Sequence, residues 1–258
     1  MSQTFSNYGF ETRYDVSGEG PAVILIHGVG SSRQSWDGVV ERLEGYQTLR
    51  YDLRGHGGSG KPAGPYTLDD FVADLAALLD HVGIAKGHVV GFSLGGLIAQ
   101  GFALAHGDRV DKLVLISTVS GRTDEERERV KTRLEMVQGG IPGAHFRKSM
   151  DRWFTPAFQA ANPDLIDRLE AANQGNDPKA NAAAYRVLAI SDLAERLPEI
   201  TAETLVMTGE DDLGSNPRMA RLMHDRIANS QLNILAGLRH SILNEAPDTV
   251  AAALREFL

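Results

Sequence analysis

The chain contains no cysteine among its 258 residues. Disulfide bonds, thiolate metal sites and a cysteine nucleophile are therefore excluded. It also lacks any uninterrupted apolar run of the roughly 18 residues that a membrane-spanning helix requires. The first twenty residues have neither a basic start followed by an apolar stretch nor a small-residue cleavage site. We therefore expect a cytoplasmic protein with no membrane partner.

Clusters of positive charge are equally scarce. The formal net charge is -8, and no block of lysine and arginine stands out. Nucleic acid is therefore not an expected partner. The 42% hydrophobic and 23% charged residues are ordinary for a soluble globular protein with one large domain and room for an insertion. We expect a small-molecule substrate, with a homodimer as an open alternative to a monomer.

Short apolar runs recur along the chain and have the composition of buried strands. They occupy residues 23–26, 48–51, 88–91, 113–117, 205–208 and 232–235. Helix-length amphipathic segments lie between most of them, and the clearest is 69–82, where apolar residues recur at helical spacing after an acidic start. Continuous apolar strands that alternate with helices predict an α/β fold with a mainly parallel sheet covered on both faces.

This alternation stops after Ser117. From about 121 to 200 the sequence is typical of successive helices, rich in Ala, Arg and Glu. Breaks are expected near 139–143 ("GGIPG"), Pro156, Pro163 and Pro178. The sequence thus predicts a core of residues 1–120 and 201–258 interrupted by a helical cap of residues 121–200. We interpret the charge run 124–129 as the solvated first turns of a helix.

One serine has a distinctive setting, in "GFSLG" at residues 91–95. An apolar strand precedes Ser93 and a helical segment with small residues follows it, which is the context of a nucleophile elbow. Gly-rich turns between strand and helix also occur for packing alone. The sharper hypothesis is that Gly91 and Gly95 make room for Ser93 as an exposed nucleophile. Such a serine needs a base that accepts its proton and donors that stabilise the developing oxyanion.

The partners of such a serine follow in the order acid, then histidine. His240, in "GLRHSILNEAP", comes after the last predicted strand, a loop position suited to a catalytic base. The acid is expected just beyond strand 205–208, where Glu210, Asp211 and Asp212 are all candidates. We favour Asp212 because the Gly-x-x-Asp spacing carries it past the turn, and we keep Asp211 as the alternative.

Donors for the oxyanion are expected from two backbone N–H groups. One belongs to Val29, in the glycine-containing loop "LIHGVGSS" after the first apolar strand, and the other to Leu94, directly after the serine. Neither segment alone would be strong evidence for a serine hydrolase. Together with Ser93, Asp212 and His240 in the required order, they indicate serine hydrolase chemistry with no metal or cofactor.

On these motifs the chain resembles the α/β-hydrolase superfamily over nearly its whole length. The segments 51–62 ("YDLRGHGGSGKP") and 109–117 ("RVDKLVLIS") are also similar to it. The resemblance implies an eight-stranded, mostly parallel sheet with a helical cap after the sixth strand. Within the superfamily the chain looks most like 3-oxoadipate enol-lactonases and related small carboxylic-ester hydrolases, particularly in the cap stretch 151–193. It differs from the usual enol-lactonase pattern at residues 27–30 and 212–217.

The resemblance implies hydrolysis of a small carboxylic ester or enol lactone through an acyl-serine. Hydrolysis of a C–C bond in a ring-fission product, or of an amide, would use the same residues. A ligand receptor on a hydrolase fold is a third hypothesis. Substrate selection is expected from the cap, with Trp153 and Phe154 on its inner surface, although both residues could equally form the core of the cap.

Overall fold

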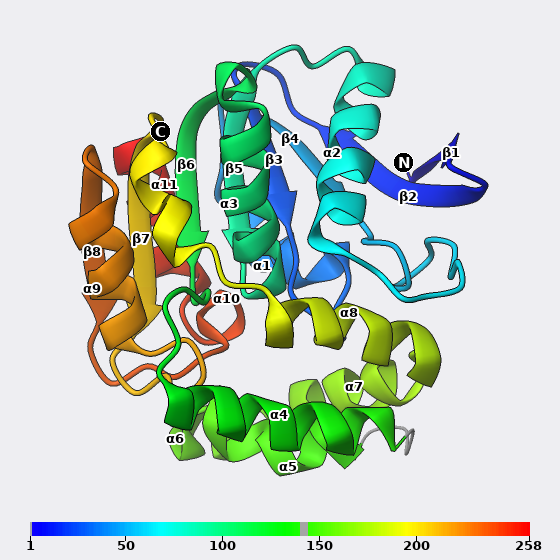
Figure 1. Cartoon of the computed structure of the whole chain (residues 1–258), viewed down its shortest axis with the longest axis vertical. Coiled ribbons are helices and arrows are strands. Elements are labelled where there is room, and N and C mark those ends of the chain that lie inside the picture. The colour runs from blue at the N-terminus through cyan, green and yellow to red at the C-terminus, as the bar shows by residue number, and fades with distance from the viewer. Residues whose placement is uncertain (1, 140–143) are drawn as a thin grey trace.

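A single eight-stranded sheet organises the protein. The computed structural model describes residues 2–139 and 144–258. The strand order is β1-β2-β4-β3-β5-β6-β7-β8 (Figure 1). The strands are β1 (Gln3–Asn7), β2 (Phe10–Ser17), β3 (Ala22–Ile26), β4 (Gln47–Tyr51), β5 (Gly87–Phe92), β6 (Val110–Ile116), β7 (Glu203–Gly209) and β8 (Ser230–Leu235). The pairings β1–β2 and β2–β4 are antiparallel and all others are parallel, which confirms the mainly parallel sheet.

The six apolar runs form β3 to β8, and alternate residues of these strands pack into two different hydrophobic clusters. On one face lie residues such as Ile24, Val89 and Leu115. Their neighbours Leu25 and Val90 belong to the cluster on the other face. Both faces of a parallel sheet are buried, and this is why these strands read as continuous apolar runs rather than alternating ones.

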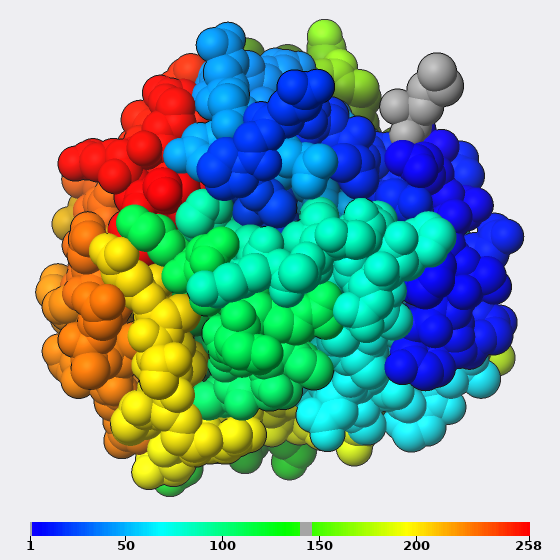
Figure 2. All heavy atoms as spheres, turned by 90° about the horizontal axis from the view of Figure 1, so that it is seen from above, coloured from blue at the N-terminus to red at the C-terminus, as the bar shows by residue number. Residues whose placement is uncertain are grey.

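The strands β1 and β2 have no such apolar run and were not among the predicted strands. The residues of β1 are exposed or half-buried, because the strand lies at the edge of the sheet. It is held by its antiparallel pairing with β2, from Gln3 opposite Tyr14 to Asn7 opposite Phe10. Seen from the end opposite the cap, the colours run from dark blue at this edge to orange at the β8 edge (Figure 2).

Helices cover both faces of the sheet (Figure 1). One face carries α2 (Leu68–Val82), α3 (Leu94–Ala105) and α9 (Pro217–Arg226), and the short η2 (Gly107–Arg109) follows α3. The other face carries η1 (Arg33–Trp36), α1 (Asp37–Val40), α10 (Ile242–Glu245) and α11 (Pro247–Phe257). The predicted helix 69–82 is α2, which begins at a capping box of Thr67 and Asp70 and ends at Gly83 with a φ of 76°.

Between β6 and β7 the chain forms a layer of helices across the ends of the strands (Figure 1). These are α4 (Asp124–Gln138), α5 (Ala144–Trp153), α6 (Pro156–Ala161), α7 (Pro163–Gln174) and α8 (Pro178–Ile190), followed by η3 (Ala194–Glu199). Each of the three prolines expected to break the helices is the first residue of the next one, where its missing N–H costs nothing. Most of the break expected at 139–143 lies outside the described residues. We call residues 121–200 the cap and the remainder the core.

One prediction within the cap fails at a single residue. The run 124–129 does begin a helix, α4, but Glu126 is buried rather than solvated. Its Oε1 accepts a hydrogen bond from Asn216 Nδ2 at 2.7 Å, and its Oε2 forms an ion pair with Arg218 at 2.5 Å. The charge run therefore contains a side chain that joins the cap to α9 of the core.

A second carboxylate, that of Asp192, connects the segments near both ends of the cap. Asp192 accepts hydrogen bonds from the backbone N–H groups of Gly121 at 2.8 Å and Arg122 at 3.1 Å, where the cap begins. It accepts a third from Ala194 at 3.1 Å, where the cap ends. The two crossings between cap and core are thus held together at one point.

None of the helices in the described part of the chain has the length and apolar character needed to cross a bilayer.

Candidate active site

Ser93 lies in a tight turn between β5 and α3, with the left-handed backbone angles φ 55° and ψ -114°. Non-glycine residues rarely adopt a positive φ, and such strain costs of order 1–3 kcal/mol. The surrounding backbone holds it there: the Ser93 N–H donates to the Ile116 carbonyl at 2.9 Å, and its carbonyl accepts from the Thr118 hydroxyl at 2.7 Å. The strain is therefore supported by the neighbouring strand β6 and the residues after it.

The glycines beside Ser93 are required by close backbone contacts. A Cβ at Gly91 would collide with the carbonyl of Gly95, and a Cβ at Gly95 would collide with the carbonyl of Ile26. The first residues of α3 therefore lie directly against the end of β3. This close approach brings the Ser93 turn beside the loop that follows β3, as the elbow hypothesis requires.

The half-buried His240 and the buried Asp212 form a pair. The Nδ1 atom of His240 lies 2.7 Å from Oδ2 of Asp212. The other carboxylate oxygen, Oδ1, accepts hydrogen bonds from the backbone N–H groups of Gly214 at 2.8 Å and Ser215 at 2.9 Å. His240 is in the loop between β8 and α10, and the ring of Phe92 packs against its imidazole with centroids 5.1 Å apart. Both members of the pair are thus fixed in orientation.

The three acidic residues after β7 have different surroundings. The side chain of Asp212 is 1% exposed, whereas Glu210 and Asp211 are exposed. Burial acts to raise the pKa of the Asp212 carboxyl, but the charge of His240 and the hydrogen bonds from His240, Ser215 and Gly214 outweigh it, so the pKa lies below the ordinary value. Asp212 therefore remains an anion beside His240. The structure places Asp212, not Asp211, at this position.

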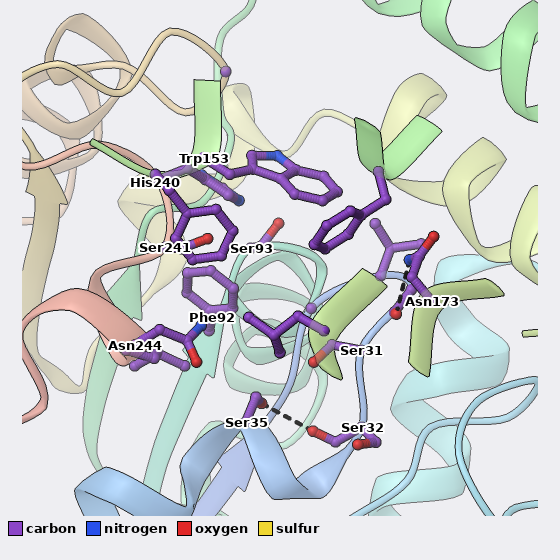
Figure 3. A pocket seen from close by; sticks show the side chains of 18 of the residues that line it. Ser31, Ser32, Ser35, Phe92, Ser93, Trp153, Asn173, His240, Ser241 and Asn244 are labelled. Carbon is purple, nitrogen blue, oxygen red and sulfur yellow. Dashed lines mark hydrogen bonds between the residues drawn. The ribbon is translucent and has the colours of Figure 1, made fainter. Parts of the chain in front are cut away.

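Ser93, Asp212 and His240 all line one cavity of about 660 Å³ between the core and the cap. Figure 3 shows Ser93 near the middle of this cavity, with His240 and Trp153 above it and Ser31 below. The volume lies within the range of about 300 to 1,000 Å³ typical of small-molecule sites. The site is thus concave and can enclose a small ligand against the Ser93 turn.

The two residues expected to supply oxyanion donors are beside this turn. Val29 is half-buried in the loop after β3 and lines the cavity. Leu94 is the first residue of α3, where a backbone N–H has no partner within the helix. The dipole of α3 adds a partial positive charge at the same end. Both N–H groups therefore belong to segments that meet at Ser93.

Cap residues hold the loop that contains Val29, and this contact was not predicted. The side-chain amides of Asn173 and Asn176 donate hydrogen bonds to the Gly30 carbonyl at 3.3 and 2.9 Å, and the first is drawn in Figure 3. Gly30 itself has a φ of 72°, a conformation that favours glycine. The only signal in the sequence was the two asparagines at a helix end, which are common there for other reasons.

Trp153 and Phe154 lie at the end of α5, and both line the cavity. They also belong to the aromatic cluster of the cap, in which Phe154 is buried and Trp153 packs on Phe146 with ring centroids 5.5 Å apart. The backbone carbonyl of Trp153 accepts a hydrogen bond from the Ser241 N–H at 2.9 Å. The two alternatives raised by the sequence thus coincide, since these side chains are part of the cap core and of the cavity wall.

Four arginines of the cap also line the cavity, and the sequence reasoning missed them. Their identities are Arg122, Arg133, Arg152 and Arg168. The sequence showed that the cap is rich in arginine but not which side chains face inward.

Among the described residues, no cluster of three or more His, Cys, Asp or Glu side chains could hold a metal ion.

Comparison with known proteins gives relatives over almost the whole length. Residues 21–247 match the model of the alpha/beta hydrolase fold family. The chain is 28% identical over 216 residues to 3-oxoadipate enol-lactonase 2 of Acinetobacter baylyi, covering 83% of this chain and 80% of that protein. It is 28% identical over 250 residues to the (E)-2-((N-methylformamido)methylene)succinate hydrolase of the same species, covering 95% and 93%.

A solved structure gives the same result. The enol-lactonase from Burkholderia xenovorans LB400 superimposes with a TM-score of 0.93 at 26% identity, covering 99% of both chains. The family model and this structure agree with the eight-stranded, mostly parallel sheet. The chain therefore belongs to the α/β-hydrolase family and, within it, is similar to enol-lactonases.

Proposed function

We propose that the protein is a serine hydrolase that cleaves a small carboxylic ester or enol lactone through an acyl-serine intermediate. The observation that carries the proposal is the arrangement of Ser93, His240 and the buried Asp212 around one cavity. A serine hydroxyl is a weak nucleophile until a base accepts its proton, and an oriented imidazole performs that role in hydrolases of unrelated folds.

In the first step, the Ser93 oxygen attacks the carbonyl carbon of the ester while His240 accepts the hydroxyl proton. Asp212 holds the Nδ1–H of the imidazole and stabilises the imidazolium that forms. The N–H groups of Val29 and Leu94 stabilise the negative charge on the carbonyl oxygen. The tetrahedral intermediate then collapses, the C–O bond to the alcohol breaks, and His240 transfers its proton to the departing oxygen.

In the second step, water attacks the acyl-serine carbonyl. His240 now removes a proton from the water, and the same N–H groups stabilise the second oxyanion. The bond to the Ser93 oxygen breaks, Ser93 recovers its proton from His240, and the carboxylic acid leaves. For a lactone, the departing alcohol remains attached to the acyl chain, so both products are one molecule.

The substrate class is supported by the size of the cavity and by the relatives. A cavity of about 660 Å³ suits a small molecule, and relatives of this chain include proteins named as enol-lactonases. The relative named as a hydrolase of (E)-2-((N-methylformamido)methylene)succinate supports testing bonds other than esters as well. A substrate panel should therefore contain small esters, enol lactones, amides and dienone acids from ring fission.

Labelling with a fluorophosphonate probe, followed by peptide mass mapping, tests the nucleophile. We expect wild-type protein to be labelled at Ser93, and Ser93→Ala to lose both labelling and turnover, with kcat lower by roughly 10⁴- to 10⁶-fold. Labelling of another serine in Ser93→Ala with activity retained would contradict the assignment. Stoichiometric labelling of wild type with no steady turnover on the whole panel would instead indicate a ligand receptor.

A further inference from the structure

The cap side of the cavity is positively charged although the chain as a whole is acidic. Four arginines line it: Arg122 before α4, Arg133 on α4, Arg152 on α5 and Arg168 on α7. The acidic residues on the same lining are Asp37 and Asp212. Against a formal net charge of -8 for the chain, this local excess of positive charge is a property of the cavity rather than of the composition.

These four arginines differ from several other arginines of the cap. Within residues 2–139 and 144–258, none of the four forms an ion pair with a carboxylate. By contrast, Arg127 pairs with Asp192 at 3.2 Å, Arg129 with Glu125 at 2.8 Å and Arg147 with Glu170 at 2.7 Å. Three arginines on the outer surface of the cap are thus neutralised, whereas the four that line the cavity have no carboxylate counter-ion among the described residues. The exposed Arg186, away from the cavity, also has none.

The environment of Arg152 bears most directly on the binding of a ligand. It is half-buried, and one of its terminal nitrogens, Nη2, donates to the buried Ser149 hydroxyl at 2.5 Å. Burial and the neighbouring positive charge of Arg133 lower the pKa of its guanidinium, against the weaker opposing influence of Tyr185 and Asp212. Arg122 differs, because its guanidinium already donates to the Leu188 carbonyl at 2.8 Å. Arg152 and Arg133 thus retain donors and charge for another partner.

Asp212, an acid whose charge acts on Arg152, already has a partner on each carboxylate oxygen. Its Oδ2 contacts His240, and its Oδ1 accepts from the N–H groups of Gly214 and Ser215. A half-buried cation without a paired anion is unfavourable, since burial removes the water that would otherwise stabilise the charge. An anion entering the cavity would remove this penalty and bind to groups already held in place.

We propose that Arg152 and Arg133 form a subsite for a carboxylate of the substrate, so that the substrate is an ester or lactone bearing a free carboxylate away from the bond that is cleaved. This inference rests on the proposed function. A guanidinium matches the geometry of a carboxylate through two parallel hydrogen bonds. A monoanion fits better than a phosphate dianion, because the negative charge of Asp212 also acts on Arg152 and repels the second charge more strongly.

A matched pair of esters tests the subsite. Monoethyl glutarate carries a carboxylate, whereas ethyl pentanoate of similar length does not, and acid release can be followed for both. We expect wild type to prefer the anionic ester in kcat/KM by at least about tenfold, as expected for one charge-assisted hydrogen-bonded pair. Arg152→Gln should reduce that preference by roughly 10- to 100-fold, and Arg152→Lys, which keeps the charge but not the planar fork, should reduce it less.

The matched control is Arg147→Gln. Arg147 is on the same helix α5, is exposed, pairs with Glu170 and does not line the cavity, so its loss should leave the preference unchanged. Equal kcat/KM values for the two esters in wild type would overturn the subsite. So would an Arg152→Gln variant in which both esters slow by the same factor, because Arg152 would then act on the fold or on the chemistry.

A binding measurement separates this inference from the proposed function. Calorimetric titration of monoethyl glutarate into Ser93→Ala protein needs no turnover, and we expect binding that weakens at least tenfold when Arg152→Gln is added. If wild type hydrolyses no ester but this binding is found, the proposed function is wrong and the subsite stands. If neutral esters are hydrolysed but millimolar monoethyl glutarate does not bind, the subsite is wrong and the proposed function stands.

Discussion

The two sides of the cavity are built in different ways. On the core side, the Ser93 N–H donates to the Ile116 carbonyl, and the Asp212 carboxylate accepts from the N–H groups of Gly214 and Ser215. The side chains of Ser93 and Asp212 are almost fully buried. On the cap side, the wall consists of long side chains such as Arg133, Arg152 and Trp153. Backbone contacts fix atoms more tightly than flexible side chains do, because fewer rotatable bonds separate the functional atom from the fold.

This difference assigns separate tasks to the two sides. Bond cleavage depends on positions held within a fraction of an ångström, and the core provides these. Selection among substrates depends on size, shape and charge, and the cap provides these through side chains that can be exchanged without changing the sheet. Changes in the core should therefore lower activity on every substrate, whereas changes in the cap should alter the ranking of substrates.

Among the tests of this division of tasks between core and cap, the largest effect is expected from Asp212→Asn. Because Oδ1 accepts two backbone N–H groups, the amide of the asparagine would have to present its NH₂ to His240 Nδ1. The imidazole would then carry its proton on Nε2 and could not accept one from Ser93. We expect kcat to fall by roughly 10³- to 10⁴-fold on all esters, measured at neutral pH. The exposed neighbour provides the control: Asp211→Asn should cost less than about tenfold, and the reverse order would identify Asp211 as the acid.

The next largest effect is expected from changes in the cap that act on a loop of the core. In an Asn173→Ala, Asn176→Ala double variant, the Gly30 carbonyl loses both amide donors and the loop that carries Val29 is less constrained. We expect kcat to fall by about tenfold or more with little change in KM, because a small displacement of an oxyanion donor affects the transition state most. Gln174→Ala, an exposed change at the same helix end, should leave kcat unaffected. A higher KM at constant kcat would mean that the asparagines bind substrate rather than position the loop.

A smaller effect is expected from Trp153→Ala, which concerns the cap alone. Wild type should prefer C2 to C4 p-nitrophenyl esters over C10 and longer ones by at least roughly tenfold in kcat/KM, or about 1.4 kcal/mol. Removal of the indole enlarges the cavity and should narrow that ratio, while the rate of Ser93 labelling stays within a few fold. An unchanged ratio would show that the Trp153 side chain serves only the packing of the cap. Fastest turnover of emulsified long-chain esters by wild type would contradict the small cavity as the basis of selection.

The smallest effect concerns the attachment of the cap and depends on pH. Burial acts to raise the pKa of Asp192, but hydrogen bonds from the N–H groups of Gly121, Ala194 and Arg122 and the charge of Arg127 hold it below the ordinary value. A carboxyl with a lowered pKa stabilises the fold above its unfolded-state pKa and loses this contribution as pH falls through the folded-state pKa. Asp192→Asn should therefore lower Tm at pH 7 by an amount that corresponds to about 1 kcal/mol. The difference from wild type should shrink near pH 3 in thermal melts, and a difference independent of pH would exclude a role for the charge.

Sequence patterns were sufficient where one physical constraint determines the residue type. The inner strands β3, β5, β6 and β7 contact hydrophobic residues on both faces, so their apolar runs were visible. The turn at Ser93 leaves no space for a side chain at Gly91 or Gly95, so the glycine spacing was visible as well. Asp212 and His240 could be chosen because the order of such residues along the chain follows from the order of the strands.

Other features depend on how one element packs against another. The strand β1 is polar because it lies at the edge, so its sequence is typical of a loop as much as of a strand. On α4, Arg127, Arg129 and Arg133 look alike in the sequence. Arg129 pairs with Glu125 one turn away on the same helix. Only the packing of the helix on its neighbours decides that Arg127 pairs with Asp192 and that Arg133 lines the cavity. The positive charge of the cavity was therefore not predictable from composition.

The position of Asp192 beside both crossings has a consequence for protein engineering. The chain leaves the core after β6 and returns toward β7, and Asp192 accepts hydrogen bonds at both crossings, from Gly121 and Ala194. A transplanted cap therefore needs to span only the short gap between these two crossings and to keep an aspartate at the position of Asp192. Chimeras with caps exchanged between these two crossings would transfer substrate range between scaffolds while every residue of the sheet, Ser93, Asp212 and His240 stays in place.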